Sequence, residues 1–123
     1  MQATPRRDTR PERALRSALH RLGLRYYVHR RPLAGLRREA DIVFPRLRVA
    51  VFLDSCWWHG CEEHQSWPKQ NADWWRTKIE RNRERDSDTN RRLEEAGWVV
   101  VRVWEHEDPV EAAERVAGVV RKR

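Results

Sequence analysis

The stretch ADIVFPRLRVAVFL, residues 40–53, decides the fold. Its two apolar runs, residues 40–44 and 49–53, have the length of buried strands, and the four residues between them include a proline. Two such runs with a short turn between them predict a β-hairpin. The first run carries an aspartate, Asp41, at the point where the strand begins. The hairpin is therefore predicted to hold a carboxylate near one end.

Upstream of the hairpin, residues 9–23 have the pattern of an amphipathic helix. Thr9 can cap its first turn, Pro11 suits that turn, and Gly23 is a typical stop. The apolar face is predicted to consist of Leu15, Leu19 and Leu22. A short strand is predicted over residues 26–29.

Downstream, residues 71–96 predict a long helix closed by Gly97. Residues 98–104 form a nearly continuous apolar run, which predicts a strand buried on both faces. Pro109 opens a last helix. Its predicted apolar side comprises Val110, Ala113, Val116, Ala117 and Val120. The order α-β-β-β-α-β-α predicts one mixed sheet flanked by helices.

Length and charge limit the domain organisation and the partner. The chain has 123 residues and a net charge of +7, with 26 Lys and Arg against 19 Asp and Glu. We predict a single domain over residues 9–123 behind a flexible basic arm of residues 1–8. Excess positive charge favours a polyanion, because each neutralised phosphate releases a counterion.

The remaining composition points to an intracellular protein. Neither an apolar leader nor an apolar run of membrane-spanning length is found, and two cysteines do not make a disulfide scaffold. We expect a cytoplasmic, nucleoid-associated monomer. Seven tryptophans suit either core packing or stacking against bases.

The predicted long helix has polar residues on its core-facing side. One stripe steps by four or three residues and comprises Trp75, Ile79, Asn82, Asp86, Thr89 and Leu93. Its ends are apolar and its middle is Asn-Asp-Thr. Two explanations stay open: the middle overhangs solvent, or it faces a polar site containing water or a metal.

Two further carboxylates allow both a structural and a functional interpretation. Asp41 can cap a strand end, or it can hold a hard divalent cation such as Mg²⁺. Glu12 lies in the first turn of the first helix, where a negative charge complements the helix dipole. Considered alone, Glu12 is better explained by this interaction with the helix dipole than by a functional role.

The segment CWWHGCEEH, residues 56–64, combines thiols and imidazoles without periodicity. Cys56, Cys61 and His64 have the spacing of zinc ligands, and His106 can supply a distant fourth. The alternative is two buried free cysteines and solvated histidines. His59 is left over from this set and can move a proton near neutral pH.

Taken together, these motifs resemble those of the Vsr mismatch endonucleases, from about Asp8 to Glu107. The resemblance rests on DIVF at 41–44, VF at 51–52, CWWHGC at 56–61, WW at 74–75, KI at 78–79, Asn82, RD at 85–86, GW at 97–98 and VWEH at 103–106. It implies a restriction-endonuclease-like fold of the PD-(D/E)xK superfamily with a structural zinc site. It also implies nicking of double-stranded DNA on the 5′ side of the thymine in a T·G mismatch.

The resemblance also implies residue roles. Asp41 and the main-chain carbonyl of Leu53 would hold Mg²⁺, and His59 would act as general acid or base. Acidic and polar residues near that site would be Glu12, Asp86 and Asn82. The structural zinc would be held by Cys56, Cys61, His64 and His106. The aromatic wedge that enters the duplex beside the mismatch would comprise Trp57, Trp58 and Trp75.

The sequence departs from the family pattern at several points. Leu53 stands where some members have threonine, and Asp54 either adds a carboxylate near the metal or caps the loop. The lysine common in the wider superfamily is absent, so His59 would have to carry out more of the proton transfer. The short arm before Asp8 is expected to alter mismatch affinity and context preference.

Three functional interpretations follow from the sequence. The first is a mismatch nickase, for which other mismatch-repair proteins are candidate partners. The second is a related nuclease that cuts matched, modified or otherwise mismatched DNA in restriction or defence. The third is a zinc-containing DNA-binding module without catalysis, which would leave Asp41, Asp86 and Asn82 unexplained.

Overall fold

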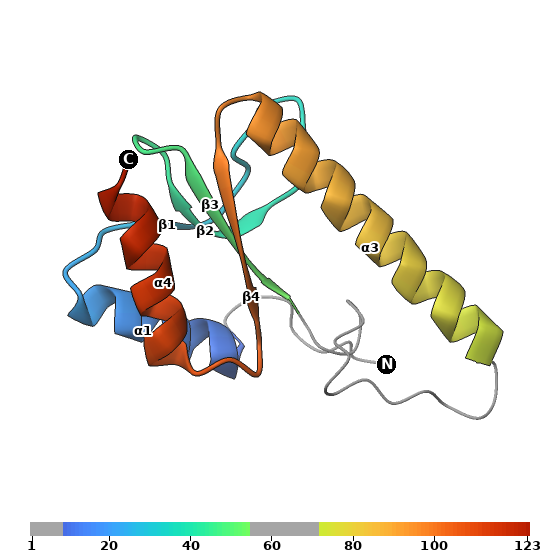
Figure 1. The fold of residues 1–123 in the computed structure, drawn as a ribbon, viewed down its shortest axis with the longest axis horizontal. Helices are drawn as coiled ribbons and strands as arrows, with labels where there is room; N and C mark the ends of the chain where they lie inside the picture. The colour runs from blue at the N-terminus through green and yellow to red at the C-terminus, as the bar shows by residue number, and fades with distance from the viewer. Residues whose placement is uncertain (1–8, 55–71) are drawn as a thin grey trace.

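The computed structural model describes residues 9–54 and 72–123, and within them a four-stranded sheet lies between helices (Figure 1). The elements are α1 (Arg10–Arg21), β1 (Tyr27–Arg30), β2 (Ala40–Phe44), β3 (Val49–Asp54), α3 (Ala72–Glu95), β4 (Val99–Trp104) and α4 (Pro109–Arg121). Their order is the predicted one. The predicted arm of residues 1–8 lies outside the described residues.

The sheet is mixed, as predicted, with the strand order β1-β2-β3-β4. The first three strands are antiparallel neighbours, and β3 pairs with β4 in parallel. The parallel pairing runs without a break from Val49 opposite Val99 to Asp54 opposite Trp104. Helix α3 lies between these two strands in the sequence, and its C-terminal end packs on one face of the sheet (Figure 1).

Helix α1 begins where its capping residues predict. The Thr9 hydroxyl accepts a hydrogen bond from the Glu12 N–H at 3.4 Å, and Gly23 follows the helix at a φ of +81°. Leu22 is not on the buried face, since it forms the C-cap and is 36% exposed. The buried side of α1 consists of Glu12, Leu15, Ala18 and Leu19.

Apolar side chains from both faces of the sheet form two core layers. On one face α1 and α4 pack against the sheet, and that layer includes Leu19, Ile42, Val51, Val103 and Val116. On the other face the C-terminal end of α3 contributes Leu93, which packs with Val43, Ala50 and Phe52. Near the end of β2 the side chains alternate between the layers, with Ile42 and Phe44 in the first and Val43 in the second, because successive residues of a strand point to opposite faces.

Besides Leu22, two details of the predicted core are wrong. In β4 only Val101 and Val103 are buried, and the other residues are half-buried. The reason is that α3 covers the second face only near its C-terminal end, while its N-terminal half extends beyond the sheet (Figure 1). In α4, Val110 is 52% exposed, and Ala112 is buried instead. Among the described residues, no helix combines the length and apolar character needed to cross a membrane.

Candidate active site

Asp41 lies near the start of β2 and is held by the neighbouring strand. The N–H of Leu53 in β3 donates a hydrogen bond of 2.7 Å to Asp41 Oδ2. The two residues predicted to share a cation are therefore in direct contact. This contact follows from the hairpin, whose pairing fixes Ile42 opposite Val51 and brings the end of β3 beside the start of β2.

Glu12 reaches the same place from α1. It is only 2% exposed, and its Oε2 lies 2.9 Å from His29 Nε2 and 3.7 Å from an Arg16 guanidinium nitrogen. Glu12 lies in the first turn of α1, as the dipole interpretation requires, and its burial among charged partners also makes it part of a polar site.

His29 is a site residue that the sequence analysis missed. The register of β1 and β2 pairs Val28 with Ile42 and Arg30 with Ala40, so His29 lies opposite Asp41. Its backbone has a φ of +51°, a left-handed conformation that is uncommon for residues other than glycine. A histidine in a strand is a weak signal by itself. Only the strand register, which depends on the loop of residues 31–39, shows its position.

Glu12, His29 and Asp41 form a group with the chemistry of a metal site. One ligand atom from each side chain lies within 4.8 Å of the others. Two carboxylates suit a hard divalent cation such as Mg²⁺, and an imidazole is accepted by first-row transition ions. The residues present therefore fit a divalent cation at this point.

The electrostatics of Asp41 agree with such a role. Burial first, and then the charges of Glu12 and Asp54, raise the pKa of Asp41 from 3.8 to about 6. The Leu53 N–H and His29 act in the opposite direction but do not cancel the effect of burial. A carboxyl group that is costly to ionise gains most from a cation placed beside it.

A second charged cluster, centred on Arg102 of β4, lies next to this site. The Arg102 guanidinium donates to Asp54 Oδ1 at 2.9 Å and to Asn90 at 3.0 Å, and lies 3.6 Å from Asp86 Oδ1. It also lies over the Phe52 ring, 4.2 Å from its centre. Asp54 is therefore an ion-pair partner of Arg102, a role that neither sequence-based alternative included.

The polar middle of the α3 stripe is explained in part by this cluster. Asp86 binds Arg102 and belongs to that group, not to the three donors around Asp41. The Thr89 hydroxyl is buried, donates to the Arg85 carbonyl and accepts from Arg38 Nε at 3.0 Å. Asn82 is half-buried, one turn before Asp86. The middle of the stripe thus faces a polar region.

The predicted zinc site and wedge are only partly within the described residues. Those that fall outside are Cys56, Trp57, Trp58, His59, Cys61 and His64. His106 is exposed in the turn after β4, and its ring stacks against Trp104 at 6.3 Å. Trp75 is half-buried and meets the Trp74 ring edge-on, with ring centres 4.7 Å apart.

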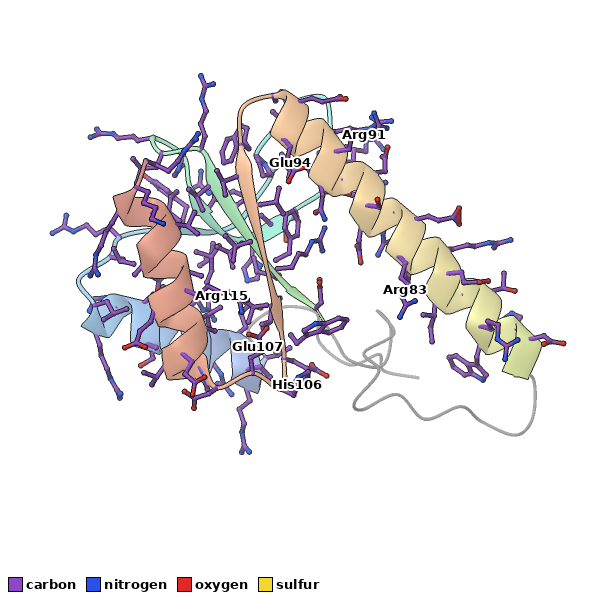
Figure 2. All side chains as sticks on the ribbon, viewed as in Figure 1. Arg83, Arg91, Glu94, His106, Glu107 and Arg115 are labelled. Atoms are coloured by element: carbon purple, nitrogen blue, oxygen red, sulfur yellow. The ribbon has the colours of Figure 1, made fainter. Side chains whose placement is uncertain are left out.

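The turn that carries His106 is fixed by its neighbour Glu107 (Figure 2). Glu107 accepts hydrogen bonds of 2.6 Å from Arg115 of α4 and from the Trp104 N–H. Partial burial alone would raise the pKa of Glu107, but these bonds and the charges of Arg115 and His106 lower it. Through Glu107, the turn that carries His106 is hydrogen-bonded to both β4 and α4.

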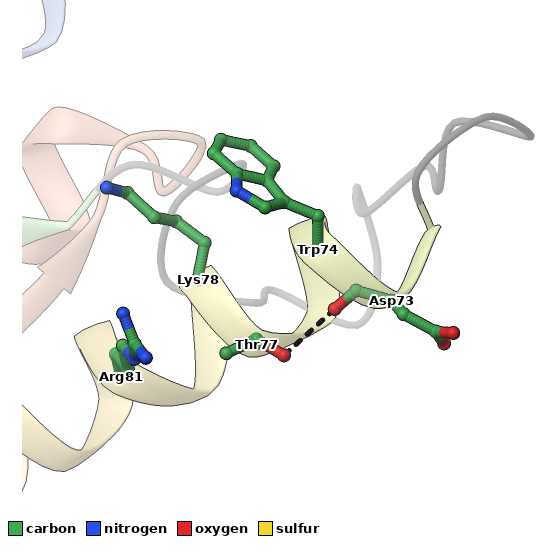
Figure 3. Close-up of a pocket in the computed structure, with 5 residues that line it drawn as sticks. All are labelled: Asp73, Trp74, Thr77, Lys78 and Arg81. Carbon is green, nitrogen blue, oxygen red and sulfur yellow. Dashed lines mark hydrogen bonds between the residues drawn. The ribbon is translucent and has the colours of Figure 1, made fainter.

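A basic and aromatic hollow lies on the projecting half of α3 (Figure 3). Its volume is about 350 Å³, and it is lined by Asp73, Trp74, Thr77, Lys78 and Arg81. Trp74 is 56% exposed, and the Lys78 ammonium lies 5.9 Å from the centre of its ring. Cations beside an exposed aromatic ring suit contact with a nucleic acid.

Comparison with known proteins gives the same family as the motifs of the sequence. The family model described as DNA mismatch endonuclease Vsr matches residues 1–65. The chain is 48% identical to the type II nicking enzyme V.NaeI of Lentzea aerocolonigenes, over 98% of this chain and 72% of that protein. It is 36% identical to the DNA mismatch endonuclease Vsr of Escherichia coli K12, over 85% of this chain and 66% of that one.

A solved structure shows the same fold. The catalytic domain of the homing endonuclease I-Bth0305I superimposes with a TM-score of 0.51 at 14% identity, covering 94% of this chain and 90% of that domain. This likeness concerns the fold alone. The matched family model and the identities with its named members assign the sequence: the chain belongs to the Vsr family of DNA endonucleases.

Proposed function

We propose that this endonuclease nicks one strand of a DNA duplex at a mismatched base pair, on the 5′ side of the thymine in a T·G mispair, and that it depends on Mg²⁺. The observation that carries the proposal is the meeting of Glu12 and Asp41 beside Leu53. Asp41 and the Leu53 carbonyl would hold the cation. When bound, the cation would polarise the scissile phosphate and a water molecule.

The other proposed roles belong to residues of this chain. His59 moves a proton to or from the reacting oxygens. Trp57, Trp58 and Trp75 insert at the mismatch, where the weaker stacking makes separation of the bases less costly. Basic side chains dock on phosphates and set the register without reading the sequence.

We also propose a structural zinc ion held by Cys56, Cys61, His64 and His106. The zinc would fix the segment that carries His59 and two of the tryptophans. Metal analysis of the purified chain should find one zinc per molecule. A protein that contains no zinc and melts at the same temperature with and without a chelator would contradict this assignment.

A cleavage panel tests the main proposal. Labelled duplexes with T·G, other mismatches or only matched pairs are incubated with Mg²⁺ or with EDTA. We expect a single nick in the T·G strand, with Mg²⁺ only. Asp41→Ala should abolish nicking and leave DNA binding in place, and His59→Ala should slow it by about a hundredfold or more.

Glu114→Ala serves as the control, because it removes an exposed carboxylate from α4. It should nick like the wild type. If Asp41→Ala nicks at the wild-type rate, the assignment of the cation site is wrong. If matched and mismatched duplexes are cut equally, the mismatch preference is wrong.

A second candidate is favoured by the names of the relatives. Several are type II nicking enzymes, among them V.NaeI and V.XorIIP of Xanthomonas oryzae. A nickase of that kind would act at other matched, modified or mismatched sites, using the same carboxylates. Adding duplexes with methylated cytosine to the panel distinguishes it, since only this candidate predicts cutting without a T·G mispair.

A further inference from the structure

His29 presents its two ring nitrogens to two different carboxylates. Nε2 lies 2.9 Å from Glu12 Oε2, and Nδ1 lies 3.7 Å from Glu39 Oε1. The His29 side chain is only 11% exposed, so these contacts are largely shielded from water. Histidines that bind metals commonly use one ring nitrogen for the ion and turn the other toward a carboxylate. His29 has this orientation, with Nε2 toward the site.

The backbone of His29 points to the same role. Its φ of +51° interrupts an otherwise extended edge strand directly opposite Asp41. A left-handed conformation at a residue with a large side chain is unfavourable, and such residues are concentrated at ligand sites and active sites. Here the conformation accompanies an imidazole lying between α1 and the loop before β2.

We propose that His29 Nε2 is a direct ligand of the divalent cation at the Glu12–Asp41 site, and that it makes the site selective for Mn²⁺ over Mg²⁺. The inference rests on the proposed function in one respect, because that function places a cation at Asp41. It adds a nitrogen donor and an ion preference.

The distances are those of a coordination sphere. Two donors that each lie about 2.1 Å from an octahedral ion, at right angles, are about 3.0 Å apart. The separation of Glu12 Oε2 and His29 Nε2 is 2.9 Å, and all three donors lie within 4.8 Å of one another. An ion can therefore meet all three with only small side-chain movements.

The donor types decide which ion is favoured. Mg²⁺ prefers oxygen ligands and keeps most of its waters, so an imidazole adds little to its binding. Mn²⁺ takes carboxylates as readily and accepts imidazole nitrogen more readily, as first-row transition ions do. A site with two carboxylates and one imidazole should consequently bind Mn²⁺ more tightly than Mg²⁺.

The test measures metal binding on the full chain without DNA. Electron paramagnetic resonance titration gives the Mn²⁺ affinity, competition gives the Mg²⁺ affinity, and electron spin echo modulation detects nitrogen coordinated to bound Mn²⁺. The variant is His29→Asn, because asparagine tolerates the left-handed backbone but lacks the imidazole. His20→Asn, at an exposed position in the last turn of α1, is the matched control.

We expect the wild type and His20→Asn to bind Mn²⁺ on the order of tenfold or more tighter than Mg²⁺, with a nitrogen signal. In His29→Asn the nitrogen signal should disappear, and Mn²⁺ affinity should fall by about tenfold or more with little change for Mg²⁺. If circular dichroism shows that His29→Asn is unfolded, His29→Gly replaces it, since glycine adopts this φ freely.

Two results would overturn the inference. If the nitrogen signal and the Mn²⁺ preference survive in the folded His29 variant, His29 is not a ligand, while Mg²⁺-dependent nicking is unaffected. If the wild type binds neither ion and nicks equally in EDTA, both the ligand assignment and the proposed metal dependence fail. The two failures are therefore distinguishable.

Discussion

Asp41 is held in the fold at an energetic cost. The shift of its pKa from 3.8 to about 6, caused first by burial, corresponds to about 3 kcal/mol against the ionised form. This figure already includes the opposing effect of the hydrogen bond from the Leu53 N–H. Near neutral pH the protein without a divalent cation therefore carries a destabilising charge at the start of β2.

Replacing that carboxylate should stabilise the metal-free protein. Because the folded pKa of Asp41 lies above the unfolded one, its cost is absent below about pH 4, grows between pH 4 and 6, and is complete above pH 6. Asp41→Asn should raise the free energy of unfolding by up to about 3 kcal/mol at pH 7, with no gain near pH 4. Urea denaturation in EDTA at pH 7 and at pH 4 measures the free energy of unfolding of the variant and of the wild type.

The control for this prediction is Asp73→Asn, which removes an exposed carboxylate of α3. Because Asp73 is exposed, this substitution should change the free energy of unfolding at pH 7 by no more than about 0.5 kcal/mol. A gain for Asp41→Asn that stays the same from pH 4 to pH 7 would contradict the assigned pKa.

The site residues that the sequence revealed are those with a local anomaly. Asp41 is an acid at the start of an apolar strand, and Asp86 is an acid on a core-facing stripe. His29 has no such signature, and Arg102, a charged residue in an apolar run, has partners that the local sequence does not show. His29 depends on the register across a loop, and Arg102 finds Asp54 only through the parallel pairing of β3 with β4. Contacts between distant segments are not contained in local periodicity.

At the scale of elements, Arg102 connects α3 to the sheet. Its guanidinium contacts Asp54 of β3 and Asp86 and Asn90 of α3, and its side chain is only 20% exposed. Leu93 makes the apolar contact further along the helix. Together they fix the C-terminal half of α3, from which the N-terminal half projects.

Replacing Arg102 should lower the free energy of unfolding far more than replacing an exposed arginine of α3. Arg102→Met leaves the carboxylate of Asp54, which is 8% exposed, without its cation, and should lower the free energy of unfolding by about 3 kcal/mol or more. Arg91→Met breaks an ion pair with Asp88 whose arginine is 61% exposed, and should cost less than about 1 kcal/mol.

Urea denaturation of both variants provides the comparison. Adding Asp54→Asn to Arg102→Met should restore part of the loss, because no buried charge then remains at Asp54. Equal losses for Arg102→Met and Arg91→Met would show that the cluster does not anchor α3.

The types of the elements were predictable because each has a clear period and clear ends. Thr9 and Gly23 bound α1, and Gly97, with a φ of +89°, follows α3. The predicted burial of β4 was wrong for a reason of packing. An apolar strand suggests two covered faces, yet the length of α3 gives no indication that only one end of it lies on the sheet.

At the scale of the whole molecule, charge and shape act together. The chain carries a net charge of +7, and the projecting half of α3 presents Lys78 and Arg81 beside Trp74 (Figure 3). Helix α4 ends on the opposite side of the molecule (Figure 1). We therefore expect the DNA-binding surface to include the projecting half of α3.

The salt dependence of DNA affinity tests whether the projecting half of α3 contacts DNA. Arg81→Ala should reduce the slope of log affinity against log salt concentration by about 0.9, the contribution of one phosphate contact. Arg121→Ala, at the exposed end of α4, should leave the slope unchanged. Fluorescence anisotropy with a labelled duplex measures both slopes. An equal reduction for the two variants would mean that the positive charges attract DNA without a defined contact surface on α3.

The parallel pairing of β3 with β4 has a consequence for how the chain refolds. The hairpin of β2 and β3 closes over four residues, whereas each β3–β4 partner is separated by fifty positions, as Val49 and Val99 are. The longer closure costs about 2 kcal/mol more entropy. The hairpin should consequently be the nucleus, with β4 added late. Asp41 and Leu53 would then meet early, and Arg102 would join Asp54 only as the barrier is crossed.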